Sequence, residues 1–214
     1  MINQQGQTHV NMHTGTIPQQ LNHGGHEVMD VHEVLSGTVG TLNQYSLLRK
    51  YVKDPELLTI MDRQYQFIQT EYNITVDCFK SGQDPAQPTQ TYNMTQNNND
   101  FIYGLTPTAP KKPIQSDMEM SEELVAGCLL SYAKNNATAK TMAACESTNP
   151  VVRRVLADSI PNCVEMAYEL SIFLNKHQKY QVPQFSQQDM MQITNSFAPA
   201  QGQPQIQFNN NIQH

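Results

Sequence analysis

The stretch HGGHEVMDVHEVLSG, residues 23–37, gathers three histidines, two glutamates and an aspartate. Imidazole nitrogens and carboxylate oxygens are common ligands of divalent metal ions. His23, His26 and Asp30 could therefore form a metal site at the surface. Nothing in their spacing fixes a coordination geometry, so this hypothesis stands beside two others, a solvated helix start and a contact surface.

The position of these residues on a helix favours the simpler interpretations. His26, Asp30 and Glu33 recur at helical spacing on the face opposite the apolar residues, so they are expected to point outward. Glu27 and Asp30 fall in the first turns, where acidic groups interact favourably with the helix dipole. The expected inward positions are Val28, Val31, Leu35, Thr38, Leu42 and Tyr45.

Two glycines follow on or near the same outward face. Glycine inside a helix costs up to about 1 kcal/mol relative to alanine, but it lets another backbone approach closely. Either the long helix simply tolerates them or the face is used for assembly. The candidates for partner contact are His26, Asp30, Glu33, Gly37 and Gly40.

The overall composition limits the possible function classes. The 214 residues carry a net charge of −6, which argues against a nucleic-acid-binding surface because phosphates are bound by clustered Lys and Arg. No apolar run reaches the length of a membrane span, and the first residues lack the pattern of a secretory signal. We therefore expect a cytoplasmic protein, whose Cys78, Cys128, Cys145 and Cys163 are small core residues rather than disulfides.

Gln, Asn and Pro divide the chain into periodic and non-periodic parts. We predict a flexible tail at 1–25, a helical domain at 26–178 and a second polar tail at 179–214. Such tails bury too little apolar surface to offset the entropy of ordering them, and we expect them to be disordered. Within the domain, 3,4 spacing of apolar residues predicts helices at about 26–52, 54–81, 117–147 and 150–178, with a crossover loop at 82–116.

Helix boundaries are marked by capping residues. Asp54-Pro55 and Asn149-Pro150 each offer an N-cap followed by proline in the first helical position. Ser116 and Glu119 have the spacing of a capping box for the third helix. Short turns make each pair of helices an antiparallel hairpin, and the long crossover predicts an all-α, ferritin-like four-helix bundle.

A bundle of this topology can hold two metal ions through bare glutamates and E-x-x-H pairs that point inward. This sequence has no E-x-x-H, and the helices at 54–81 and 117–147 contain no histidine. The predicted inward positions also carry no carboxylate. We therefore expect an apolar interior without a buried di-iron or di-manganese site, no cofactor and no catalytic residue.

The two hairpins also resemble a known family. "HEVMDVHEVLS" followed by "LNQYSLLRKYVKDPELLTIMDRQ" resembles the first hairpin of the spore coat protein F family. The second hairpin, "DMEMSEELVAGCLLSYAKNNATAKTMAACESTNPVVRRVLADSIPNCVEMAYELSIFLNKH", is similar to that of the same family. The resemblance covers about residues 26–180 and implies a ferritin-like fold in a protein of endospore-forming bacteria.

The function implied by this resemblance is structural. It suggests a non-enzymatic component of the endospore coat, made in the mother-cell cytoplasm and then incorporated into the coat. Its expected partners are other coat proteins and further copies of the chain, not nucleic acid. The alternative is a ferritin-like metal-binding or oxidase protein that uses the His23–Glu33 cluster, and an adaptor that binds through the outward face of the first helix is a third hypothesis.

Overall fold

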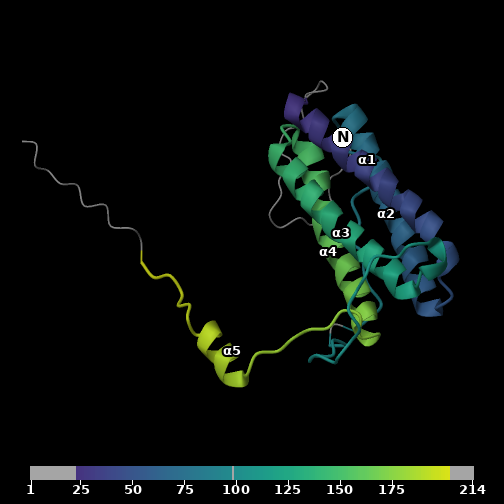
Figure 1. Cartoon of the computed structure of the whole chain (residues 1–214). Coiled ribbons are helices and arrows are strands. Elements are labelled where there is room, and N and C mark those ends of the chain that lie inside the picture. The colour runs from purple at the N-terminus through teal and green to yellow at the C-terminus, as the bar shows by residue number, and fades with distance from the viewer. Residues whose placement is uncertain (1–22, 98, 203–214) are drawn as a thin grey trace, which may run out of the picture. The chain divides into compact units, whose positions relative to one another are not determined.

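The computed structural model describes residues 23–97 and 99–202, and in these ranges its regular secondary structure is helical (Figure 1). The long helices are α1 (Gly25–Leu48), α2 (Pro55–Ser81), α3 (Glu122–Glu146) and α4 (Pro150–Lys176). Short 3-10 helices, η1 (Arg49–Tyr51) and η2 (Asp117–Glu119), follow α1 and precede α3. The all-α class predicted from the sequence is confirmed.

The two interhelical turns are built in the same way. The Asp54 side chain accepts hydrogen bonds from the amides of Glu56 and Leu57 at 2.8 and 3.1 Å. The Asn149 side chain accepts from the amides of Val151 and Val152 at 2.9 and 3.2 Å. In each case the next residue is a proline in the first turn of the helix. A backbone N–H at this position has no partner within the helix, so proline loses no hydrogen bond there. Each hairpin therefore turns at an Asx-Pro pair.

The third helix starts later than the predicted capping box places it. Ser116 makes no side-chain cap and precedes η2, whereas Ser121 accepts from the amide of Leu124 and α3 begins at Glu122. Met118 is 93% exposed, and the first buried residue of α3 is Val125. Ser121 lies closer than Ser116 to the buried residues of α3. The helical turn that follows Ser121 therefore gains stability from packing, and Ser121 is the N-cap.

The four long helices pack side by side. Helix α1 packs against α2 and α3, and α4 packs against the same two helices, so α1 and α4 lie diagonally opposite. At one end the Gly24 amide donates to Thr148, and at the other the Asp54 amide donates to Glu122. These contacts make α1 antiparallel to α3. Two clusters fill the interior, one including Leu57, Leu129 and Phe173 and the other including Val31, Val151 and Leu156.

The inward face of α1 differs from the predicted face by one residue at several positions. Val28, expected inside, is 40% exposed, while Glu27, expected in solvent, is 0% exposed. Both sets of positions have 3,4 spacing, so periodicity alone does not distinguish them. The observed buried residues of α1 are Glu27, Val31, Val34, Thr38, Thr41, Tyr45 and Leu48.

The crossover runs along α4 in the same direction as that helix. Asn162 of α4 accepts from the Tyr92 amide at 2.9 Å and donates to the Gln90 carbonyl. Further along α4, Asn175 accepts from the Ile102 amide and donates to its carbonyl. Tyr92 is 3% exposed and belongs to the larger hydrophobic cluster. A polar-rich segment is thus held in place by side chains of α4.

Residues 183–202 belong to a separate unit of the chain. That unit contains a helix, α5 (Gln187–Thr194), in the segment expected to be a disordered tail. The Ser186 side chain caps it by accepting from the Asp189 amide at 3.1 Å. In the part of the chain that the structure describes, no helix has the length and apolar character needed to span a membrane.

The buried Tyr92 ring provides a test of how far the crossover stabilises the fold. Tyr92→Ala should lower the free energy of unfolding by about 3–5 kcal/mol, because it removes a large buried side chain and leaves a cavity. Ile114→Ala, at a 39% exposed position in the same segment, should change it by no more than about 0.5 kcal/mol. Urea unfolding followed by circular dichroism measures both values, and equal effects would contradict a docked crossover.

Candidate functional site

Glu27 lies in the first turn of α1 and is completely buried. One carboxylate oxygen accepts from the Thr148 amide at 2.8 Å, the Thr148 hydroxyl at 2.7 Å and the Asn149 amide at 2.9 Å. Burial by itself raises the pKa of Glu27, but the hydrogen bonds from Thr148, Asn149 and His23 outweigh it and hold the pKa below its ordinary value. Glu27 is therefore a charged acceptor that binds α1 to the α3–α4 turn.

His23 completes this joint. Its Nδ1 lies 2.6 Å from the second Glu27 oxygen, and its Nε2 donates to the Phe79 carbonyl at 2.8 Å. The imidazole ring also packs against the Phe79 ring, with centroids 5.2 Å apart. Both ring nitrogens thus have partners inside the protein. The His23 side chain connects the start of α1 to the end of α2.

A second joint repeats the first at the other end of the helices. Glu122, the first residue of α3, accepts from the backbone amides of Lys53 and Asp54 in the α1–α2 turn. Glu122 follows Glu27 by the same number of residues as Asn149 follows Asp54. In each hairpin, a glutamate at the start of the first helix therefore binds the amides of the turn in the other hairpin. The two hairpins therefore carry the same Glu and Asx-Pro pattern at the same spacing.

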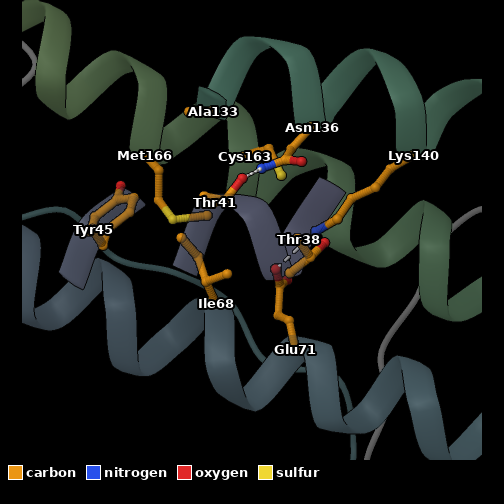
Figure 2. A pocket seen from close by; sticks show the side chains of 10 residues that line it. All are labelled: Thr38, Thr41, Tyr45, Ile68, Glu71, Ala133, Asn136, Lys140, Cys163 and Met166. Carbon is orange, nitrogen blue, oxygen red and sulfur yellow. Dashed lines mark hydrogen bonds and ion pairs between the residues drawn. The ribbon is translucent and has the colours of Figure 1, made fainter. Parts of the chain in front are cut away.

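A buried ion pair lies between these two ends. Lys140 of α3 is 6% exposed and its Nζ lies 3.0 Å from a Glu71 oxygen of α2 (Figure 2). Asn162 of α4 donates to the other Glu71 oxygen at 2.6 Å. Burial alone lowers the pKa of Lys140, but the adjacent Glu71 charge reverses this effect and raises the pKa. The Lys140–Glu71 pair and its Asn162 partner thus join three helices.

A small cavity adjoins this pair. Figure 2 shows residues from all four long helices around it, among them Thr41, whose hydroxyl accepts from the Asn136 side chain at 3.0 Å. Its volume of about 10 Å³ is close to the minimum that one water molecule requires. No organic substrate fits there. The groups that line the cavity are Thr38, Thr41, Tyr45, Ile68, Glu71, Ala133, Asn136, Lys140, Cys163 and Met166.

A third buried carboxylate, Glu169 of α4, joins α2 and the crossover. It accepts from the Gln64 side chain at 3.0 Å and the Thr95 amide at 3.1 Å, and also from Arg63 and Tyr92. Gln64 in turn accepts from the Tyr45 hydroxyl of α1. The prediction of an interior without carboxylates is therefore wrong, since Glu27, Glu71 and Glu169 are each at most 7% exposed.

The candidate contact residues of α1 lie mainly on the surface. His26, Glu33, Gly37 and Gly40 are exposed, and Asp30 is half-buried. A Cβ at Gly40 would meet no atom within 4 Å, and one at Gly37 would lie 3.9 Å from Asn136 Oδ1. Of these residues, Gly37 borders the side of α1 that faces α3. The structure therefore leaves most of these side chains accessible to solvent.

The candidate metal ligands are not brought together. His23 turns toward Glu27 and Phe79, whereas His26 is exposed. Across residues 23–97 and 99–202, no three His, Cys, Asp or Glu side chains form a group that could hold a metal ion. The donor atoms of the opening stretch therefore serve as partners within the protein where they are buried and contact solvent elsewhere.

The cysteines differ from the prediction that all four are core residues. Cys78 and Cys163 are buried, Cys128 is half-buried and Cys145 is exposed. Burial raises the pKa of the Cys78 thiol to about 12, so this group stays protonated and is a poor nucleophile. Burial also raises the pKa of Cys163. Both thiols lie in the hydrophobic clusters of the core, and the Cys163 thiol also lies beside Lys140.

The polar joints share one chemical property. Each buried carboxylate has donors on both of its oxygens, and the space next to the Lys140–Glu71 pair holds at most one water molecule. Such groups fix the relative positions of the chain segments that donate to them. Periodicity and hydropathy do not predict these joints, because both place glutamate in solvent. The equal spacing between Glu and Asx-Pro in the two hairpins is the signal that could have identified the joints at Glu27 and Glu122.

The low pKa of Glu27 predicts a loss of stability in acid. Because this pKa is lower in the folded chain than its ordinary value of 4.5, the stabilisation is complete above about pH 5 and is lost as the pH falls through the folded-state pKa. Glu27→Gln should lower the free energy of unfolding at pH 7 by about 3–5 kcal/mol, and the gap should narrow on acidification. Urea titrations between pH 7 and 3 test this, with exposed Glu33→Gln as a control that should match wild type.

The buried ion pair predicts a non-additive pair of substitutions. Lys140→Met should destabilise the fold by about 3–5 kcal/mol, because it leaves the Glu71 charge buried with Asn162 as its remaining partner. The double variant Lys140→Met, Glu71→Leu should recover most of that loss, because no uncompensated charge remains. Thermal and urea unfolding measure the coupling. A double variant as unstable as the sum of both single variants would contradict this account.

Comparisons with known proteins identify the family of this chain. Residues 121–183, which contain α3 and α4, match the Coat F domain family. The chain is 52% identical over 180 residues to the spore coat protein F-like protein YhcQ of Bacillus subtilis (strain 168), covering 84% of this chain and 82% of that protein. No solved structure matches it significantly. The chain belongs to the spore coat protein F-like family.

Proposed function

We propose that this chain is a non-enzymatic structural component of the bacterial endospore coat. The observation that carries the proposal is the 52% identity with a spore coat protein F-like protein over most of both chains. The buried polar groups support it, because their hydrogen bonds are made within the protein and none is directed at a substrate-sized cavity near the Lys140–Glu71 pair. The protein is made in the mother-cell cytoplasm and is then incorporated into the coat.

The scaffold that we infer is a ferritin-like four-helix bundle. It is supported by the ring in which α1, α2, α4 and α3 contact one another, and by a crossover that returns along α4. The polar segments predicted at 1–25 and 179–214 include residues 1–22 and 203–214, which lie outside the described part of the chain. The inter-hairpin joints at Glu27 and Glu122 make it a rigid unit suited to repetitive assembly.

Assembly is proposed to use the exposed surface of α1, including His26, Glu33, Gly37 and Gly40, with Asp30 at its edge. The support is that glycines keep this part of the helix narrow, with open space at Gly40. The partners would be other coat proteins or further copies of this chain, not nucleic acid. The metal-binding or oxidase alternative has weaker support, because both His23 nitrogens already have partners.

The proposal predicts where the protein is found. A fluorescently tagged copy, expressed in a spore-forming host during sporulation, should accumulate around the developing spore and remain with the coat fraction of purified spores. The surface variant His26→Ala, Glu33→Ala should stay diffuse in the mother cell if α1 is the contact surface, while Glu146→Ala on α3 should localise normally. Finding the wild-type protein absent from spores would overturn the coat assignment, whereas normal localisation of the double variant would move the contact surface elsewhere.

A further inference from the structure

The crossover carries three prolines at equal spacing between its docked part and η2. They are Pro107, Pro110 and Pro113. A proline fixes its own φ at about −65° and confines the preceding residue to extended conformations. Within residues 106–113, only Thr108 and Lys111 are free of these restrictions. The sequence therefore favours a polyproline II helix, which has three residues per turn and places the three prolines along one edge.

The structure presents this segment to solvent and holds it at both ends. Residues 102–119 are all exposed. At one end, the Gln181 side chain accepts from the Thr106 amide at 2.7 Å and donates to the Thr106 carbonyl at 3.1 Å. At the other end, the Gln115 amide donates to the Glu119 side chain at 3.2 Å. A stiff segment with both ends held loses little conformational entropy when it binds another molecule.

The proline edge is turned away from the body of the domain. An open cleft of about 530 Å³ lies between the segment and the residues that follow α4. From the crossover, the cleft is lined by Leu105, Thr106, Thr108, Ala109 and Lys111, and by none of the three prolines. Lys112 is also outside this lining. The prolines and Lys112 are therefore accessible to a partner without displacing any part of the domain.

Local charge and shape indicate the chemistry of such a partner. The chain has a net charge of −6, yet residues 101–116 contain Lys111 and Lys112 and no acidic residue. Segments with the pattern P-x-x-P bind in grooves lined by aromatic side chains, which hold the proline rings. Basic residues next to the prolines are complementary to carboxylates at the rim of such a groove.

A second P-x-x-P pair in the same crossover provides an internal comparison. Pro85 and Pro88 have the same spacing, but Pro85 is half-buried. The Ala86 amide between them donates to Asp77 of α2 at 2.8 Å, and Asp84 forms an ion pair with Arg154 of α4. This pair is bound to the domain and has no lysine beside it. Proline spacing alone therefore does not distinguish the two segments, whereas exposure and charge do.

We propose that residues 106–113 are a docking segment for a protein that has an aromatic-lined groove with an acidic rim. The proline edge enters the groove, and Lys111 and Lys112 pair with carboxylates of the rim. This inference goes beyond the coat assignment and does not depend on it. The alternative is that the segment is only a stiff spacer that spans the distance to η2.

The test measures binding of the full-length chain to a purified SH3 domain that has tryptophan in its groove and an acidic rim. Because this chain contains no tryptophan, the fluorescence of the groove reports binding without background. Wild type should give a saturating change with a dissociation constant on the order of 100 μM. The double variant Pro107→Ala, Pro110→Ala and the double variant Lys111→Glu, Lys112→Glu should each weaken binding by about tenfold or more.

The matched control is Pro88→Ala, at an exposed position of the same crossover, and it should bind as wild type does. Circular dichroism checks that all variants keep the helical content of wild type. No saturating change with wild type would overturn the proposal and leave the segment as a spacer. Binding that either double variant leaves unchanged, or that Pro88→Ala weakens equally, would overturn it as well.

Discussion

Complete hydrogen bonding of buried carboxylates is the constraint on which the arrangement of the helices depends. A carboxylate that leaves water without new donors destabilises the fold by several kcal/mol, whereas one with saturated oxygens fixes its donors in space. Glu27 has donors from the start of α1 and from the α3–α4 turn. Glu122 binds the α1–α2 turn. The hairpins are thus locked together at both ends by interactions that tolerate no sliding of one hairpin along the other.

The sequence predicts features whose partners are neighbours in the chain better than features whose partners are far away in the chain. The hairpins follow from local signals, because Asp54-Pro55 and Asn149-Pro150 cap their helices with atoms of neighbouring residues. The burial of Glu27 depends on donors at Thr148 and Asn149, more than a hundred residues away. Hydropathy cannot reveal such a partner. The same reason accounts for the missed partners of Glu71 and Glu169, whose donors lie on other helices.

The crossover shows the limit of composition as a guide to order. Its many Gln, Asn and Pro residues indicate a segment with too little apolar surface to fold on its own. Its stability comes from α4, whose Asn162 and Asn175 bond to its backbone. The burial of one aromatic residue, Tyr92, adds an apolar anchor. A sequence scan evaluates such a segment alone and therefore misses order supplied by a neighbouring helix.

Charged side chains are distributed unevenly between the interior and the surface of α1. Several titratable side chains lie inside, where Lys140, Glu71 and Glu169 join helices. Residues 34–48 of α1, in contrast, contain no Asp, Glu, Lys or Arg. Charges placed inside give each helix a unique position, because only one arrangement satisfies all of them. An uncharged outer face needs no specific charged partners, and removing it from water costs less free energy than removing charged side chains.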